Sequence, residues 1–206
     1  MENWLPIILV FVGVAVVAIL IYIIYRVRNP RPGKGKAHGR NFKREAVVSA
    51  ARNFARGNKF AIISPAHLKR GDALANLDAI IVGYFGVLGV ISLGYGGTIY
   101  GKPDEENWVQ HAEDGSRHKF PNPINEASAC VRVIRDALFS AKLRKIPVEV
   151  VYVFSHPKTA LAMPRSVQPM RTKDFKKLLK KDKYLDDCGL DMEKVEKALL
   201  QSLNDQ

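Results

Sequence analysis

Cysteine is scarce in this chain of 206 residues, which contains Cys130 and Cys188 and no third cysteine. Two cysteines so far apart match neither a disulfide framework nor the paired ligand spacing of a structural zinc site. The five histidines also lack zinc-ligand spacing, both with one another and with the cysteines. The sequence therefore predicts no such metal site. Because Cys130 falls on the apolar face of a predicted helix, we expect a buried free thiol there.

Charge is absent from residues 5–25, LPIILVFVGVAVVAILIYIIY. A helix over these residues is about 31 Å long at about 1.5 Å per residue, enough to cross a hydrocarbon core of about 30 Å. Trp4 at one end and Tyr22 and Tyr25 at the other are typical of membrane interfaces. The sequence predicts one transmembrane helix here. The alternative, a cleaved signal peptide, would have a basic start, a shorter apolar run and a small-residue cleavage site.

Acidic residues are absent from the next segment, residues 26–44, which holds eight Lys or Arg. Positively charged flanks stay on the cytoplasmic side of a membrane. The pattern therefore predicts a short outer N-terminus (1–4), a basic tether (26–40) and a cytoplasmic domain (41–206). We expect a single-pass protein of the cell membrane, with lipid contacted through the predicted helix.

The net charge of +12 is concentrated in two segments, the one just described and residues 171–183, which have seven basic and two acidic groups. Attraction to anionic lipid contributes about 1 kcal/mol per basic group near the surface. Nucleic-acid phosphates are the alternative partner, and a solvated helix face is a third interpretation of the second segment. The candidate residues for binding lipid or nucleic acid are Arg26, Arg28, Arg31, Lys34, Lys36, Arg40, Lys43, Arg44, Lys176, Lys177, Lys180 and Lys181.

Asp, Glu, Lys, Arg and His are also absent from residues 79–101. This stretch is long enough for a second membrane span, but its seven glycines disfavour a continuous helix. Two apolar runs, 77–82 and 87–93, flank a turn at Gly83–Gly86, which predicts a hairpin of buried strands.

The remaining patterns predict an α/β domain in the order α, β, β, β, α, β, α, α. Residues 102–122 are polar, with scattered Pro and Gly, and are predicted to be a loop. The domain's core is expected within about 41–160, and its closing helices within 171–206. Helices are expected over about 41–56, 124–144, 173–181 and, after an Asp191 cap, to the end of the chain; further strands are expected at 60–64, 98–100 and 148–154.

Several short segments resemble the NERD (nuclease-related) domain, a branch of the PD-(D/E)xK restriction-endonuclease-like superfamily. The resemblance spans about residues 41–160 and implies an αβββαβ core. The segments that carry it are Asn76–Val82 (NLDAIIV), the turn at Gly86, Gly97–Gly101 (GTIYG), Trp108, Asn122-Pro123 and, in the first helix, Glu45.

The resemblance also implies a metal-dependent nuclease site, which this sequence lacks in part. In the family an Asp and a Glu hold a divalent cation, and a Lys two residues after the Glu stabilises the charge-rich transition state. Asp78 keeps the first position, but Ile91 and Leu93 stand at the Glu and Lys positions. We therefore interpret Asp78 and Glu45 as remnants of a catalytic site and predict no metal or other cofactor.

The favoured hypothesis is a membrane-anchored, catalytically degenerate domain that binds nucleic acid or protein and has no small-molecule substrate. The first alternative is a Mg²⁺-dependent nuclease with a rearranged site, in which Glu126, Glu45 or Lys102 approaches Asp78. The second is a structural protein whose two basic segments lie on anionic lipid. The sequence identifies no particular partner and no oligomeric state.

Overall fold

The structure is a computed structural model, and the chain divides into two compact units, residues 1–35 and 36–206. The predicted membrane helix lies outside the described residues, apart from Ile19. In the part of the chain that is described, no helix is long and apolar enough to cross a membrane. The described residues are 19, 39–164 and 166–204.

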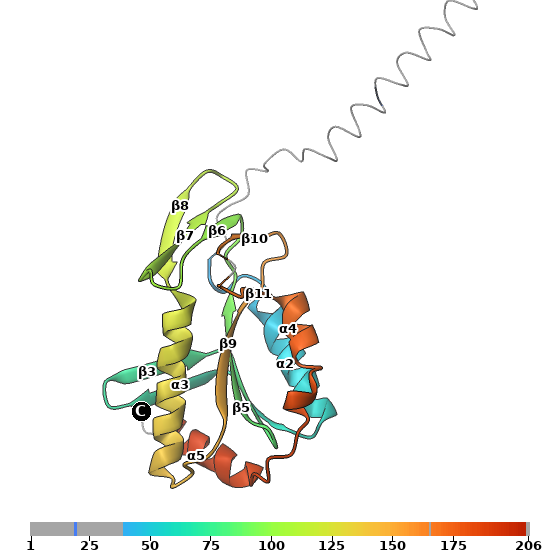
Figure 1. The fold of residues 1–206 in the computed structure, drawn as a ribbon, viewed down its shortest axis with the longest axis vertical. Helices are drawn as coiled ribbons and strands as arrows, with labels where there is room; N and C mark the ends of the chain where they lie inside the picture. Colours follow the sequence, from blue (N-terminus) through green and yellow to red (C-terminus); the bar gives the residue numbers. More distant parts are fainter. Residues whose placement is uncertain (1–18, 20–38, 165, 205–206) are drawn as a thin grey trace, which may run out of the picture. The chain divides into compact units, whose positions relative to one another are not determined.

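A five-stranded sheet forms the centre of the second unit (Figure 1). The strands β4 and β5 form the predicted antiparallel hairpin, and β5 runs parallel to β9. Every residue of β4 and β5 is buried, which explains why this part of the sequence contains no charge. The strand order is β1 (Ala61–Ile63), β4 (Ala79–Gly83), β5 (Gly86–Leu93), β9 (Val148–Phe154) and β11 (Met170–Arg171).

Helices cover both faces of this sheet, with α3 on one side and α2 and α4 on the other (Figure 1). Alternate residues of β5 enter two separate hydrophobic clusters: Ile91 packs with α3 and α5, whereas Val90 packs with α2 and α4. This two-sided burial is typical of a sheet with parallel strands. The helices are α2 (Arg44–Gly57), α3 (Pro123–Ser140), α4 (Thr172–Leu178), α5 (Met192–Asn204) and the 3₁₀ turn η1 (Asp182–Tyr184).

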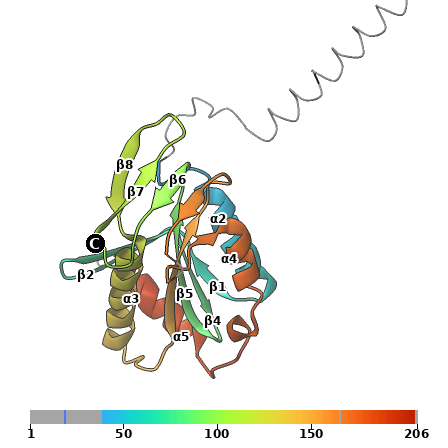
Figure 2. The same ribbon diagram turned by 45° about the horizontal axis from the view of Figure 1, so that its top comes forward.

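A second, four-stranded sheet lies beyond one end of the first (Figure 2). Its strands β7 and β8 form a hairpin within residues 102–122, so the predicted loop is wrong. Trp108 and Phe120 pair across this hairpin and are buried, while most of its other residues are exposed. The dipeptide Asp114-Gly115, which is typical of hairpin turns, was the sequence signal for this hairpin. The order is β10 (Ala160–Ala162), β6 (Thr98–Tyr100), β7 (Asn107–His111) and β8 (Arg117–Pro121).

A further hairpin, β2 (Ala66–Arg70) with β3 (Ala73–Leu77), was also not predicted. Asp78 separates β3 from β4, so the predicted strand 77–82 is divided at that residue. The bounds predicted for β6 and β9 are confirmed.

The helix ends differ from the predictions by a few residues. The first helix was expected to be capped by Asn41, but it begins at Arg44, because Lys43 adopts a left-handed conformation with φ 52°. The long helix ends at Ser140 rather than near residue 144, and Lys142 beyond it has φ 64°. The predicted cap of the last helix is confirmed, since the Lys194 N–H donates to Asp191 Oδ1 at 3.1 Å.

Candidate functional site

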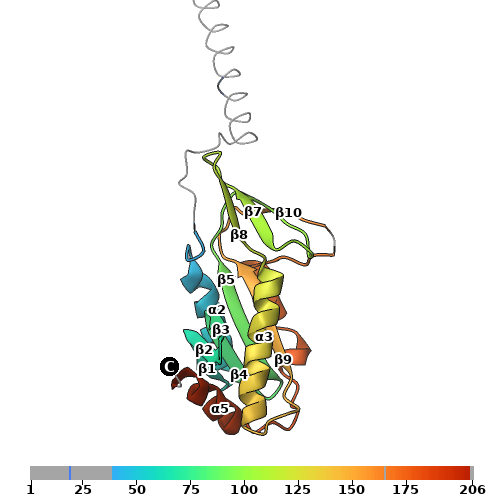
Figure 3. The same ribbon diagram turned by 90° about the vertical axis from the view of Figure 1, so that its left-hand side faces the viewer.

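The candidate site lies where β5 ends and where α2 and α3 begin, at the same end of the central sheet (Figure 3). Asp78, between β3 and β4, is 9% exposed. Arg44 is the first residue of α2, and Glu126 belongs to the first turn of α3. The topology thus gathers at one end of the sheet groups that are far apart in the sequence.

Both carboxylate oxygens of Asp78 have partners. Oδ1 lies 2.6 Å from Nε of Arg44, and Oδ2 accepts a hydrogen bond from the backbone N–H of Ser92. The Asp78 N–H donates to the Val90 carbonyl at 2.8 Å, and its carbonyl accepts from the Ser64 hydroxyl at 2.7 Å. A buried carboxylate is tolerated when it is paired and hydrogen-bonded in this way.

A second ion pair lies beside the first. Nη2 of Arg40 is 2.5 Å from Oε1 of Glu126. Burial disfavours the charged guanidinium, but the hydrogen bond that Arg40 donates to Glu126 and the negative charges of Glu126 and Asp78 raise the pKa of Arg40 above its ordinary value. Two carboxylates are thus balanced by two guanidinium groups.

Two weaker acids, Tyr95 and Cys130, lie near these two ion pairs. Burial raises the pKa of the Tyr95 hydroxyl, whose ring stacks on Phe120 at a centroid distance of 4.1 Å. Cys130 is a buried free thiol, as predicted. Burial, with a contribution from the charge of Glu126, raises its pKa to about 11. A protonated thiol is a poor nucleophile, so Cys130 does not fit covalent catalysis.

The residues present do not fit a divalent cation. Magnesium prefers several carboxylate, carbonyl and water oxygens in an octahedral arrangement. Asp78 is committed to Arg44 and Ser92, and Ile91 is fully buried in the core. Leu93 is 1% exposed in the same cluster. Within the described residues, no group of three or more His, Cys, Asp or Glu is arranged to hold a metal ion.

Glu45 does not take part in this cluster. Its Oε1 accepts from the Ser49 hydroxyl at 3.1 Å and pairs with Arg52 at 3.2 Å, and its side chain is 72% exposed. The neighbouring Arg44 approaches Asp78 instead. Lys102 is exposed. Of the residues considered for a rearranged site, the described contacts bring only Glu126 into the same electrostatic cluster as Asp78.

The basic residues expected to bind lipid or nucleic acid divide into three groups. Arg40 and Arg44 are ion-paired at the candidate site, and neither was expected there. Lys43 is exposed, as are Lys176, Lys177, Lys180 and Lys181, on or after α4. Arg26, Arg28, Arg31, Lys34 and Lys36 lie outside the described residues.

The segment before α3 is held by two side chains that the sequence singled out. Asn122 caps α3 by accepting from the Ile124 N–H at 2.9 Å, and its amide donates to three carbonyls, including that of Glu105 at 2.6 Å. Nε1 of Trp108 donates to the Lys102 carbonyl at 2.9 Å. A Cβ at Gly101 would lie 2.3 Å from the Trp108 ring, so this close approach requires glycine.

A mixed α/β domain with a buried aspartate at the edge of a hairpin strand is compatible with a nuclease-like core. The sequence model of the NERD family, the nuclease-related domain, matches residues 40–155. This match covers more than half of the chain, which therefore belongs to the NERD family. No curated protein and no solved structure matches the chain. Family membership establishes a nuclease-related fold.

Proposed function

We propose that this protein is a membrane-anchored NERD domain that has lost phosphodiester hydrolysis and binds nucleic acid at the cytoplasmic face of the cell membrane. The observation that carries the proposal is the ion pair between Asp78 and Arg44. The carboxylate that a metal-dependent nuclease would use is neutralised by the protein's own cation. The chain supplies no Glu or Lys beside it, because Ile91 and Leu93 occupy those positions.

A metal ion would have to displace this pairing. The side chains of Arg44 and Asp78 are 35% and 12% exposed, so the pair lies between the exposed and the fully buried case. Separating such a pair costs between about 1 and about 3 kcal/mol. Glu126 would also have to leave Arg40 before it could serve as a second ligand. Both costs oppose metal binding, which supports a binding role rather than catalysis.

Nucleic acid is the favoured partner because the uncompensated charge of the described domain is positive and lies on and beside α4. Lys176, Lys177, Lys180 and Lys181 are exposed, and no carboxylate among the described residues forms a salt bridge with them. Phosphate contacts by such side chains release counterions and give an affinity that falls steeply with salt.

The anchoring part of the proposal rests on the sequence. Residues 5–25 form an uncharged apolar run, and basic residues follow it directly. This arrangement supports a cytoplasmic position for the NERD domain. Protease treatment of sealed cells should spare the domain, and treatment of inverted membrane vesicles should degrade it; the opposite result would contradict the orientation.

Loss of hydrolysis is tested on the full chain, purified in a zwitterionic detergent. Single- and double-stranded DNA and RNA are incubated with millimolar Mg²⁺ or Mn²⁺, beside Asp78→Ala and Glu126→Gln. We expect no cleavage above that of the variants. Robust cleavage that disappears in Asp78→Ala would establish the rearranged nuclease instead.

Binding is tested on the same preparation by fluorescence anisotropy over a range of salt concentrations. We expect binding to single- or double-stranded oligonucleotides, with a logarithm of the affinity that declines linearly with the logarithm of the salt concentration. No binding at low salt, together with tight binding to anionic vesicles, would favour the lipid-surface alternative. Binding to neither would favour a protein partner.

A further inference from the structure

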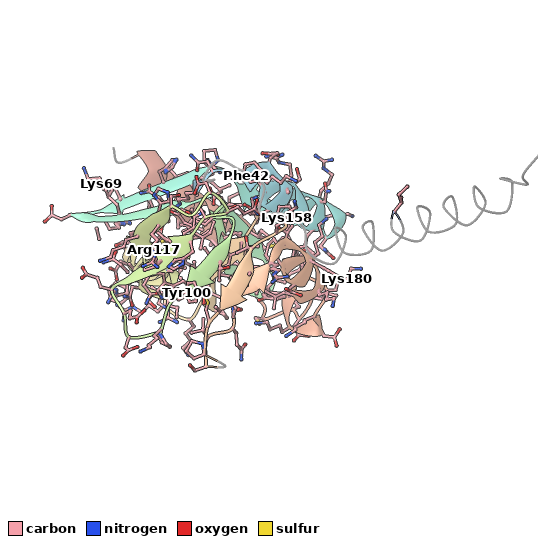
Figure 4. All side chains as sticks on the ribbon, turned by 90° about the horizontal axis from the view of Figure 1, so that it is seen from above. Phe42, Lys69, Tyr100, Arg117, Lys158 and Lys180 are labelled. Atoms are coloured by element: carbon pink, nitrogen blue, oxygen red, sulfur yellow. The ribbon has the colours of Figure 1, made fainter. Side chains whose placement is uncertain are left out.

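A pocket of about 350 Å³ lies between the start of α2, the end of β9 and the start of α4. Figure 4 looks down on this end of the molecule and labels Phe42 and Lys158, the chain neighbours of two pocket residues. Three lining residues are cationic, namely Lys43, Arg171 and Lys173. Ligand pockets in proteins start at about 300 Å³, so this one is large enough for a small charged group.

The three cations of the pocket lack carboxylate partners. No Asp or Glu among the described residues forms a salt bridge with Lys43, Arg171 or Lys173. Asp174, the residue after Lys173, accepts from the backbone N–H of Arg171 at 3.4 Å. Three like charges lining one hollow create a strongly positive potential, which attracts an anion.

A hydroxyl in the pocket is also unsatisfied. The side-chain oxygen of Thr172 is buried and has no hydrogen-bond partner among the described residues. Buried polar atoms almost always have partners, and an orphan atom needs an explanation. Rotation of the Thr172 side chain toward the pocket would let its hydroxyl donate a hydrogen bond to an oxygen of a bound anion.

The wall of the pocket is held in place before any ligand binds. The Ser155 hydroxyl donates to the Phe42 carbonyl, and the rings of Phe42 and His156 are 4.9 Å apart. These contacts tie the residues before α2 to the end of β9. Lys43 follows at φ 52°, a conformation that a non-glycine residue adopts rarely and that the surrounding contacts must maintain.

We propose that this pocket binds the terminal phosphate of a nucleic-acid strand. A terminal phosphate carries a charge of about −1.5 to −2 near neutral pH and three acceptor oxygens, which suit three cations and a hydroxyl. Arginine in particular matches phosphate geometry through paired N–H donors. A pocket also suits the end of a strand better than its middle, because a continuing strand needs room on both sides. This inference rests on the proposed nucleic-acid binding and adds which part of the strand is recognised.

The test compares three single-stranded oligonucleotides of one sequence, one without a terminal phosphate, one with a 5′ phosphate and one with a 3′ phosphate. Affinities are measured by fluorescence anisotropy with the full chain in zwitterionic detergent. We expect one phosphorylated strand to bind about tenfold more tightly than the unphosphorylated strand. Arg171→Gln, and independently Lys43→Gln, should remove that difference.

The matched controls are Lys176→Gln and Lys177→Gln, each of which removes one positive charge from α4 outside the pocket. These control variants should weaken the binding of phosphorylated and unphosphorylated strands by the same factor, and so preserve the ratio of the two affinities. Equal binding of all strands by the unaltered protein would overturn the pocket proposal while leaving nucleic-acid binding intact. The pocket proposal would also be overturned if the controls lost the preference for a phosphorylated strand as fully as the pocket variants do.

A further experiment with inorganic phosphate distinguishes two negative results: a pocket that binds no anion, and a protein that binds no nucleic acid. Phosphate should raise the Tm of the unaltered protein and of Lys176→Gln but not that of Arg171→Gln. This pattern, without binding of any strand, would retain the anion pocket and reject nucleic acid as its source. Selective binding to vesicles containing phosphatidic acid, lost in Arg171→Gln, would likewise assign the pocket to a lipid headgroup and overturn the proposal.

Discussion

Two cationic regions adjoin at the start of α2, and they differ in what surrounds their charges. Arg40 and Arg44 are each within 2.6 Å of a carboxylate oxygen. Lys43, between them in the sequence, lines a pocket whose other cations also lack carboxylate partners among the described residues. The same short segment thus serves an internal ion-pair cluster and an open anion site.

The comparison teaches that the partner of a charge, rather than its sign, indicates its role. In the ion-pair cluster two cations meet Asp78 and Glu126, so the formal charge is balanced. In the pocket the formal charge is unbalanced, and a ligand must supply the compensation. In the proposed function the first region is the remnant of a catalytic site, and the second is the site for binding.

The largest effect is expected from restoring the nuclease residues in the double variant Ile91→Glu, Leu93→Lys. Both positions are buried in the core beside α3, and the arginines already neutralise the nearby carboxylates. We expect a loss of about 4 kcal/mol or more in the free energy of unfolding, measured by urea denaturation. A stable, metal-dependent nuclease would instead show that the site has kept its original geometry.

Asp78→Asn should have the next largest effect, a loss of about 1–3 kcal/mol in the free energy of unfolding, because it leaves Arg44 without its counter-charge. Lys173→Gln, in the pocket, should change the same quantity by less than about 0.5 kcal/mol. Increased stability of Asp78→Asn would indicate that Asp78 lies among unbalanced negative charges, as in an empty metal site.

Variants of the pocket should act on binding instead of folding. Arg171→Gln should reduce the slope of log affinity against log salt by about one phosphate contact, whereas Arg52→Gln, whose partner is the exposed Glu45, should leave it unchanged. The measurement is an anisotropy titration at several salt concentrations. Identical slopes for the two variants would remove the distinction between free and paired cations.

The smallest effect is expected from pH. Burial raises the pKa of Cys130 from 9.0 to about 11. The unfolded thiol ionises first as the pH rises, so its contribution to stability is complete below pH 9 and is lost as the pH approaches 11. Urea denaturation should show stability falling over this window, with a shallower fall in Cys130→Ala. Equal slopes in the two proteins would contradict a raised pKa.

Much of the central sheet could be predicted from the sequence because its signals are local. The hairpin of β4 and β5 is an uncharged run with glycines at the turn, and β9 is apolar apart from Glu149. The hairpin of β7 and β8 was missed because one of its faces is exposed and polar, so apolar content alone does not reveal it. The Asp114-Gly115 turn carried the missing information.

The candidate site could be predicted only in part. The loss of the Glu and Lys positions is visible in the sequence, but the pairing of Asp78 with Arg44 and of Glu126 with Arg40 is not. Arg40 and Glu126 are separated by 86 positions, and nothing in their local patterns pairs them. A general signal was nevertheless present, because a buried carboxylate such as Asp78 without a metal requires a cationic partner.

Calorimetric titration of the full chain with Mn²⁺ tests the central claim most directly, namely that Asp78 is neutralised by Arg44 and not by a metal ion. The account predicts no saturable heat at millimolar metal for the unaltered protein and none for Asp78→Asn. A saturable Mn²⁺ site in the unaltered protein that disappears in Asp78→Asn would contradict it.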